Sequence, residues 1–273
     1  MRVGFIGTGS MGSILIEAFI TEGALQPNQI TASNRTRNKV EKLSEKYPGL
    51  VVADSNRDAV EHSRVIFLCI KPLEFRKVIE EILPSLTDDH LVISITSPIL
   101  IRDLEEQTPS RVIKVIPSIT NCVAAGASLM VLGKRCSEDD RHFVFSLFSK
   151  ISKPIVIDEA VIRVSSDIVS CGPAFMSYIL QRFISAAVEE TGISPEQATF
   201  LTTEMIVGLG QLISEGPFNL QTLQQRVCVP GGVTGAGLVA LEEKLGDVFN
   251  QVFRNTHEKF QTDLEEIEQM FKK

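Results

Sequence analysis

The chain has 273 residues, of which 44% are hydrophobic and 22% are charged, and its formal net charge is −7. This length exceeds the usual size of one domain, so we expect two domains, with enough apolar residues for a core. The acidic balance, with no basic stripe along the sequence, argues against a nucleic-acid partner, because nucleic-acid binding depends on clustered Lys and Arg.

The N-terminus runs directly into a predicted core strand, and no apolar run approaches the ~18 residues of a membrane span. We therefore expect a soluble, cytoplasmic protein with no membrane partner. The cysteines are widely spaced and include no C-x-x-C pair; they are Cys69, Cys122, Cys136, Cys171 and Cys228. This spacing predicts reduced thiols and no metal site.

The first predicted strand, turn and helix carry a phosphate-binding pattern. A short apolar run at residues 2–6 leads into G-x-G-x-x-G at Gly7, Gly9 and Gly12, and apolar residues then recur at helical spacing. In such a unit the first glycine permits the tight turn, the second lets the backbone approach a pyrophosphate, and the third allows close helix–strand packing. The N–H groups and the positive dipole of the new helix receive the phosphates. The pattern predicts a dinucleotide-binding domain.

Residues 29–33 read as the second strand, whose end lies where a dinucleotide fold contacts the adenosine ribose. An enzyme that selects NAD normally carries Asp or Glu there, whereas this chain continues as Ser33, Asn34, Arg35, Thr36 and Arg37. Because the guanidinium fork of Arg matches phosphate oxygens, these residues favour NADPH over NADH. The alternative is that both arginines are solvated at the start of a helix.

Further apolar segments are expected to complete an α/β sheet. They lie at residues 51–53, 65–70, 91–95, 112–117, 127–132 and 154–157, with an amphipathic helix from about 137 to 151. The run at 65–70 is continuously apolar, as a strand buried on both faces of a parallel sheet requires. It leads to Lys71 and Pro72, at the carboxyl edge of the sheet, where ligands bind. We therefore predict a dinucleotide-binding domain over residues 1–158.

Residues 159–273 change to helical periodicity. A long helix is expected from Gly172 to near Gly192, a second from Ser194 to about 216, and a short one over 220–227. A glycine-rich break at 230–235 precedes two more apolar-striped helices. Because these stripes need a partner, we predict a helical domain that dimerises. The predicted fold class is a Rossmann-like α/β domain followed by an all-α dimerisation domain.

Several motifs, taken together, resemble those of the pyrroline-5-carboxylate reductases over nearly the whole chain. They are the opening glycine pattern, Cys-Ile-Lys-Pro at 69–72, Val-Ile-Ser at 92–94, Gly-Pro-Ala-Phe at 172–175, and Pro-Gly-Gly-Val-Thr at 230–234 before Leu-Glu at 241–242. Within the family the chain resembles the ComER branch of late-competence operon proteins. The resemblance implies NAD(P)H-dependent reduction of the cyclic imine 1-pyrroline-5-carboxylate to L-proline by a homodimer or higher homo-oligomer.

The resemblance also implies site residues. Thr234 would be the catalytic residue, with the alternative that its hydroxyl is a plain helix N-cap. The residues that bind the cofactor would be Gly7, Thr8, Gly9, Ser10, Met11, Gly12, Ser33, Asn34, Arg35, Asn56, Cys69, Lys71, Pro72 and Thr96. Those that bind the imine or amino-acid substrate would be Gly231, Gly232, Val233 and Thr234.

Three segments depart from the family pattern. Residues 118–121 read Ser-Ile-Thr-Asn where typical reductases have Pro-Asn-Thr-Pro, residues 95–98 read Ile-Thr-Ser-Pro where they have Ala-Ala-Gly, and Val229 stands where they have Ser. A valine cannot donate a hydrogen bond to a substrate carboxylate, and the loss of one such contact costs ~1.5–3 kcal/mol.

Two other functions therefore stay open at this point. One is an NADP(H)-binding regulatory protein with little or no reductase turnover, since the sequence shows no clear catalytic acid–base pair. The other is a β-hydroxyacid dehydrogenase, an enzyme class whose architecture resembles the Rossmann-like and helical domains predicted for this chain. That class carries a lysine four residues after the glycine that opens the long helix, where this chain has Met176.

Overall fold

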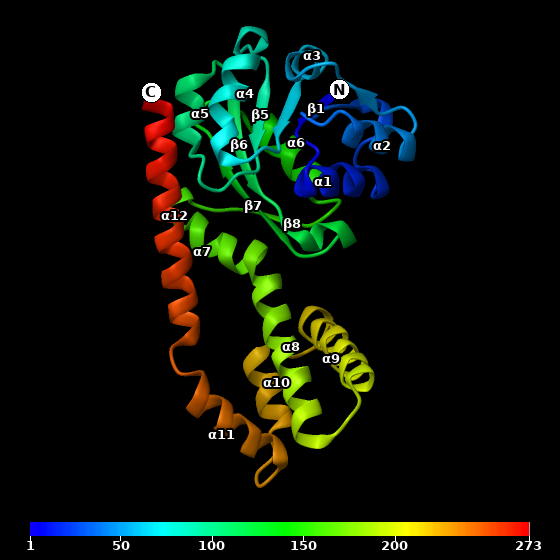
Figure 1. Ribbon diagram of the computed structural model, residues 1–273, viewed down its shortest axis with the longest axis vertical. Helices are drawn as coiled ribbons and strands as arrows, with labels where there is room; N and C mark the ends of the chain where they lie inside the picture. Colours follow the sequence, from blue (N-terminus) through cyan, green and yellow to red (C-terminus); the bar gives the residue numbers. More distant parts are fainter. Residues whose placement is uncertain (273) are drawn as a thin grey trace. The chain divides into compact units, whose positions relative to one another are not determined.

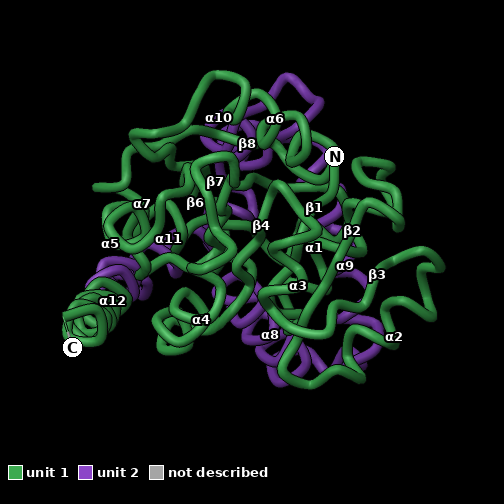
Figure 2. Tube along the Cα trace, turned by 90° about the horizontal axis from the view of Figure 1, so that it is seen from above, with its two compact units in different colours: residues 1–173, 255–273 green, residues 174–254 purple. Residues whose placement is uncertain are grey.

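The computed structural model describes residues 1–272 (Figure 1). It contains two compact units, the first formed by Met1–Pro173 with Asn255–Lys273 and the second by Ala174–Arg254 (Figure 2). The two units are defined by contacts within the chain and not by function. The functional domain boundary at residue 158 therefore stays a prediction. Among the described residues, no helix combines the length and the apolar character that a membrane span requires.

The first unit is built on one sheet with the strand order β3-β2-β1-β4-β5-β6-β7-β8. Every neighbouring pair is parallel except β6 and β7. The strands are β1 Val3–Ile6, β2 Ile30–Ser33, β3 Val51–Val52, β4 Val65–Leu68, β5 Leu91–Ser94, β6 Arg111–Ile116, β7 Ala127–Leu132 and β8 Lys153–Val156. Because Ile6 is in register with Ser33 on one side and Leu68 on the other, three strands end together at one carboxyl edge.

Helices cover both faces of this sheet. They are α1 Ser10–Thr21, α2 Asn38–Lys46, α3 Asn56–Glu61, α4 Phe75–Ile82, α5 Ile101–Gln107 and α6 Glu138–Phe148. Successive residues of a strand point to opposite faces, so Phe5 and Phe67 stack at 4.7 Å in a core that includes residues of α1 and α6. Ile6 and Leu68 face the other core, formed with α3, α4 and α5. The central strand β4 is therefore apolar at every position, and the predicted Rossmann-like domain is confirmed.

The long helix expected from Gly172 is preceded by further helical turns. Helix α7, Ile162–Ser166, passes into a five-residue π-helix, Asp167–Cys171, and then into α8, Gly172–Thr191. Pro173 explains the π-helix, because it has no N–H and its ring clashes with the carbonyl four residues earlier. That carbonyl, of Val169, instead accepts a hydrogen bond from the Ser118 hydroxyl at 2.7 Å. Ser118 is the first residue of the segment that departs from the family pattern, and its side chain thus holds the π-helix in place.

The second unit is helical. It holds most of α8, then α9 Pro195–Glu215, α10 Leu220–Val227, α11 Val233–Leu245 and the start of α12 Val248–Lys272. Ser194 caps α9 by accepting a hydrogen bond from the Gln197 N–H at 3.2 Å. Large apolar side chains on these helices are exposed, among them Phe183, Phe200, Leu201 and Val239. Their exposure on this chain agrees with the expectation of a dimerisation domain.

Candidate functional site

The glycine turn between β1 and α1 has the geometry that the sequence predicted. Gly7 has φ +99°, and a Cβ there would lie 2.4 Å from the carbonyl oxygen of Cys69. A Cβ on Gly12 would lie 2.2 Å from the carbonyl oxygen of Gly7. Gly9 is different, because a Cβ there would meet no atom within 4 Å. Gly7 and Gly12 are therefore required by the protein's own packing, whereas Gly9 leaves space open at the start of α1.

Thr8 carries an unpaired polar atom inside this turn. Its hydroxyl is buried and has no hydrogen-bond partner among the described residues. Its N–H donates to Asn34 Oδ1 at 3.1 Å, and its carbonyl accepts from the Ser13 hydroxyl at 3.1 Å, so the backbone of the turn is held on both sides. Buried hydroxyls normally have partners, and α1 has no side-chain cap. A nucleotide pyrophosphate is an acceptor that suits both the Thr8 hydroxyl and the N–H groups at the start of α1.

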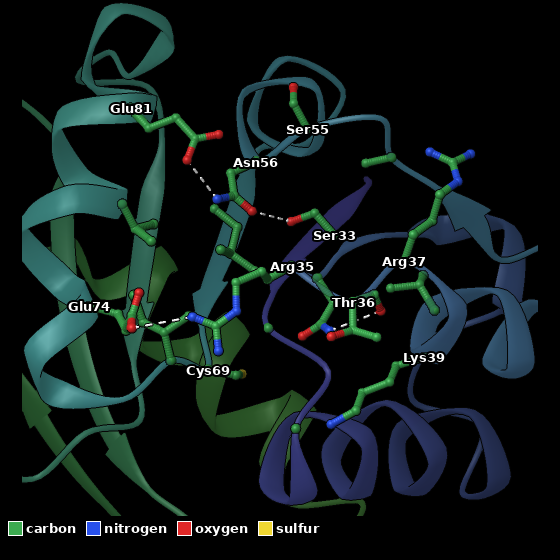
Figure 3. A pocket seen from close by; sticks show the side chains of 18 of the residues that line it. Ser33, Arg35, Thr36, Arg37, Lys39, Ser55, Asn56, Cys69, Glu74 and Glu81 are labelled. Carbon is green, nitrogen blue, oxygen red and sulfur yellow. Dashed lines mark hydrogen bonds and ion pairs between the residues drawn. The ribbon is translucent and has the colours of Figure 1, made fainter.

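A pocket of about 550 Å³ opens beside the turn, at the carboxyl ends of β1, β2 and β4 (Figure 3). Its lining is rich in charged side chains. The basic ones are Arg35, Arg37, Lys39, Lys71 and Lys77, and the acidic ones are Asp54, Glu74 and Glu81. The excess of cations favours an anionic ligand.

A chain of hydrogen bonds crosses one wall of the pocket (Figure 3). The Ser33 hydroxyl donates to Asn56 Oδ1 at 2.7 Å, and Asn56 Nδ2 donates to Glu81 Oε2 at 2.8 Å. Ser33 ends β2, Asn56 begins α3 and Glu81 lies near the end of α4, so three elements fix this wall. The structure thus brings Ser33 and Asn56 together as predicted, and it adds Glu81, which sequence reasoning missed.

The two arginines after β2 differ in how they are held. Arg37 contacts Asp54 at 2.8 Å and Glu41 at 3.0 Å, and these two hydrogen bonds raise the pKa of its guanidinium. The Arg35 side chain is 86% exposed and has a single ion pair, with Glu74 at 3.5 Å. Arg35 is therefore the arginine that can turn toward a ligand at low cost. Glu74 is a second pocket carboxylate that sequence reasoning missed.

The loops after β4 and β5 meet at the same edge. Cys69 lines the pocket, and burial raises the pKa of its thiol, so the side chain is a neutral wall. The Thr96 hydroxyl donates to the carbonyl of Ile70 at 3.1 Å and so joins the two loops. Thr96 is buried and does not line the pocket. It therefore supports this edge of the sheet by holding the two loops together.

The predicted cofactor residues separate into three groups: those that line the pocket, those that line an adjoining hollow, and those that line neither. Gly7, Gly9, Ser33, Asn34, Arg35, Asn56, Cys69 and Lys71 line the pocket. Thr8 and Ser10 line an adjoining hollow that shares Gly9 and Lys39 with it. Met11 packs against the core and Gly12 against the turn, while Pro72 begins the 3₁₀-helix Pro72–Glu74.

The predicted substrate loop lies in the second unit, before α11. Gly231 has φ +73°, and Gly232 is the N-cap of α11 without a side-chain cap. Val233 is 90% exposed, and Thr234, the second residue of α11, is half-buried. The alternative that Thr234 is a plain N-cap is therefore wrong, because Gly232 occupies that position. Val229, whose side chain replaces the family serine, is 59% exposed.

Comparisons with known proteins agree with this arrangement. A family described as NADP oxidoreductase, coenzyme F420-dependent, matches residues 2–98, and one described as pyrroline-5-carboxylate reductase dimerisation matches residues 159–263. Within the part of the chain that the structure describes, no group of three His, Cys, Asp or Glu side chains could hold a metal. The two family matches confirm the predicted NADP(H)-binding domain and the helical dimerisation domain.

Full-length relatives extend the agreement. The chain is 45% identical to ComE operon protein 4 of Bacillus subtilis over 99% of both chains. It is 26% identical to pyrroline-5-carboxylate reductase 3 of the same organism, over 97% of this chain and 98% of the relative. Among solved structures, a pyrroline-5-carboxylate reductase from Coxiella burnetii shares the fold with a TM-score of 0.84, 24% identity and 98% coverage of both chains. The chain therefore belongs to the pyrroline-5-carboxylate reductase family of oxidoreductases, in the branch represented by ComE operon protein 4.

Proposed function

We propose that the protein is an NADPH-dependent oxidoreductase that reduces a cyclic imine, 1-pyrroline-5-carboxylate, to L-proline. The observation that carries the proposal is the pocket at the carboxyl edge of the sheet. It places the open face of Gly9 and the basic side chain of Arg35 within one cavity, next to the unpaired Thr8 hydroxyl. A nucleotide pyrophosphate suits the part of the cavity beside Gly9 and Thr8, and a 2′-phosphate suits the part beside Arg35.

Ser33, Arg35 and Asn56 would hold the 2′-phosphate, and the first turn of α1 the pyrophosphate. When bound, the nicotinamide supplies the hydride for the C=N bond. The chain's own residues orient it: Lys71 and Pro72 begin the segment after β4, and Thr96 fixes the neighbouring loop against Ile70. Reduction is complete when the imine carbon has gained the hydride and the ring nitrogen a proton.

The Thr234 hydroxyl and the backbone N–H groups of Gly231, Val233 and Thr234 would bind the substrate carboxylate, whereas the Gly232 N–H donates to the Val229 carbonyl at 3.0 Å. The lack of a side-chain cap on α11 supports this role, because it leaves the Val233 and Thr234 N–H groups at the start of the helix for an anion. The match to a dimerisation family supports a homo-oligomer. We propose that it is a dimer or higher oligomer formed through the exposed apolar side chains of the second unit, acting in the cytoplasm.

A second candidate is an NADP(H)-binding regulatory protein with little turnover. The exposed side chain of Val229 favours it, because an apolar group stands where the family offers a hydroxyl to the substrate. The Ser118 hydroxyl does not replace that donor, since it is bonded to the carbonyl of Val169.

The test measures the loss of NADPH absorbance with 1-pyrroline-5-carboxylate, together with proline formation, on protein already shown to bind NADPH more tightly than NADH. We expect turnover that Thr234→Ala abolishes while NADPH binding is retained. Tight NADPH binding with no proline would refute the reductase proposal and support the regulatory one. Failure to bind either nucleotide would refute both.

A further inference from the structure

The topology of the sheet divides the cofactor edge into two halves. The strand order reverses between β1 and β4, and in doubly wound folds a dinucleotide lies across this point, with one nucleotide on each side. Ser33 ends β2, and Asn56 begins α3 after β3, so both belong to the adenosine half. The loop at residues 95–100, between β5 and α5, lies on the other side. It is therefore placed to meet the nicotinamide half.

A buried lysine holds this loop. Lys114, on β6, is 0% exposed, and its Nζ donates to Glu159 Oε1 at 2.6 Å and to the Ser97 carbonyl at 3.2 Å. Glu159 Oε1 also accepts from the Ile101 N–H at 3.2 Å, at the start of α5. One ion pair thus fixes the loop near its middle and at its end.

The loop also contains a buried hydroxyl that has no partner. Ser97 Oγ is buried and makes no hydrogen bond among the described residues. Its backbone is constrained by Lys114 on one side and by the Thr96 hydroxyl, which contacts Ile70, on the other. Because buried polar atoms normally have partners, Ser97 is a candidate to contact a polar group of a bound ligand.

Packing does not explain a charge at this position. Burial lowers the pKa of the Lys114 ammonium, against the opposing effect of the Glu159 carboxylate. Buried ion pairs can often be replaced by well-packed apolar side chains without loss of stability, and the neighbouring β6 residues Ile113 and Val115 are fully buried and apolar. What an apolar residue could not supply at position 114 is a hydrogen bond to the Ser97 carbonyl.

We propose that Lys114 and Glu159 are positioning residues that hold the 95–100 loop in the shape that receives the nicotinamide half of NADP(H), with the Ser97 hydroxyl offered to the carboxamide. This inference rests on the cofactor of the proposed function but not on its substrate. It goes beyond the predicted role of Thr96, because Lys114 and Glu159 act through the loop and do not contact the cofactor.

The experiment compares two ligands by isothermal titration calorimetry, NADPH and 2′,5′-ADP, which carries only the adenosine half. Lys114→Met is expected to weaken NADPH binding roughly tenfold and to leave 2′,5′-ADP binding within about twofold. Lys114→Arg keeps the charge and the hydrogen-bond donors, so it is expected to retain most of the NADPH affinity of the wild-type protein. Ser97→Ala is expected to weaken NADPH alone, by about threefold to tenfold.

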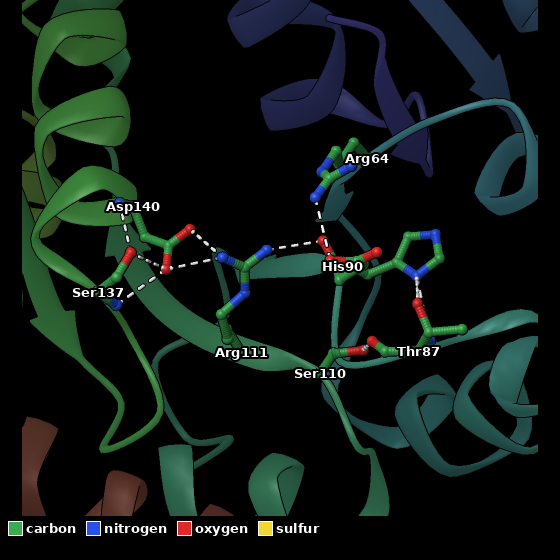
Figure 4. Close-up of polar contacts among 8 residues, drawn as sticks. Arg64, Thr87, His90, Ser110, Arg111, Ser137 and Asp140 are labelled. Carbon is green, nitrogen blue, oxygen red and sulfur yellow. Dashed lines mark hydrogen bonds and ion pairs between the residues drawn. The ribbon is translucent and has the colours of Figure 1, made fainter.

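The matched control is a second ion pair on the same strand. Arg111 contacts both oxygens of the Asp140 carboxylate at 2.9 and 3.1 Å (Figure 4). Arg111 lies at the amino end of β6, in register with Leu91 at the amino end of β5, and so at the opposite edge of the sheet from the cofactor. Asp140→Asn should lower stability without changing the ratio of the two affinities. If Lys114→Met does not fold, Glu159→Gln is tested with the same ligands and should show the same selective loss.

Equal losses for both ligands, or no loss for either, would overturn the inference. If the wild-type protein binds both ligands and only the predicted selectivity fails, the proposed function still stands. If the wild-type protein binds neither ligand, the proposed function and this inference fail together.

Discussion

The Arg35 guanidinium lies 3.5 Å from the Glu74 carboxylate, and the two residues come from opposite sides of the cofactor pocket (Figure 3). Arg35 follows β2, and Glu74 ends the 3₁₀-helix after β4. The side chain that would bind the 2′-phosphate is therefore already paired with a carboxylate. Because the Arg35 side chain is 86% exposed and that of Glu74 is 43% exposed, this pair contributes little free energy, and a phosphate dianion can displace it.

Arg35→Ala should reduce the preference for NADPH. The loss of a charge-assisted hydrogen bond to phosphate weakens NADPH binding about tenfold to a hundredfold, and NADH binding should change little. Arg37→Ala is the matched control, because Arg37 is held by Asp54 and Glu41 and should affect the ratio less. Fluorescence titration with both nucleotides measures the ratio. Equal loss for the two nucleotides would show that Arg35 does not contact the 2′-phosphate.

Glu74→Gln should have the opposite effect. Removing the carboxylate releases Arg35 and removes a negative charge from the pocket, so NADPH should bind about twofold to fivefold more tightly, with the larger gain at low ionic strength. Titrations at two salt concentrations test this. Weaker NADPH binding by the variant would mean that Glu74 itself contacts the nucleotide.

Gly9→Ala and Gly12→Ala should separate binding from stability. A Cβ on Gly9 enters open space, so the free energy of unfolding should change by less than about 1 kcal/mol while NADPH binding weakens at least tenfold. A Cβ on Gly12 would lie 2.2 Å from a backbone oxygen, so that variant should lose about 1–3 kcal/mol of stability. Urea unfolding and NADPH titration measure the two effects. If Gly9→Ala retains full NADPH affinity, the phosphates do not approach this turn.

Cysteine reactivity should follow burial. Cys122 is exposed, whereas burial raises the pKa of the Cys69 thiol and raises that of Cys136 to about 11. At about pH 8 these two partly buried thiols are protonated and should react with iodoacetamide far more slowly than Cys122. Mass spectrometry of the native protein over time gives the order of labelling. Labelling of Cys69 as fast as Cys122 would contradict the raised pKa of the Cys69 thiol.

The local parts of the site could be predicted from the sequence, because their residues lie within a few positions of one another. The glycine turn and the Ser33–Arg37 segment are of this kind. Glu74 and Glu81 could not be predicted, since only the parallel pairing of β1, β2 and β4 brings α4 against Asn56. The Lys114–Glu159 pair joins positions 45 residues apart. The N-cap of α11, Gly232, could not be distinguished from Thr234, because the sequence does not show which residue of a glycine-rich loop begins the helix.

Val229→Ser should raise reductase activity if the proposed substrate is correct. The added hydroxyl supplies a donor that the family pattern has at this position, and one such contact is worth about tenfold to a hundredfold in kcat/KM for 1-pyrroline-5-carboxylate. Val227→Ser is the control, because Val227 is also an exposed valine and lies at the end of α10. It should leave kcat/KM unchanged. An unchanged kcat/KM in Val229→Ser would show that residue 229 does not approach the substrate.

The most direct test of the reductase proposal is to follow the hydride itself. The purified protein is incubated with 1-pyrroline-5-carboxylate and NADPH deuterated at the transferred position of the nicotinamide, and the proline formed is analysed by mass spectrometry. We predict proline that carries a single deuterium on the former imine carbon, and no such product with Thr234→Ala. Tight NADPH binding without deuterated proline would contradict the reductase function and leave a nucleotide-binding regulatory role.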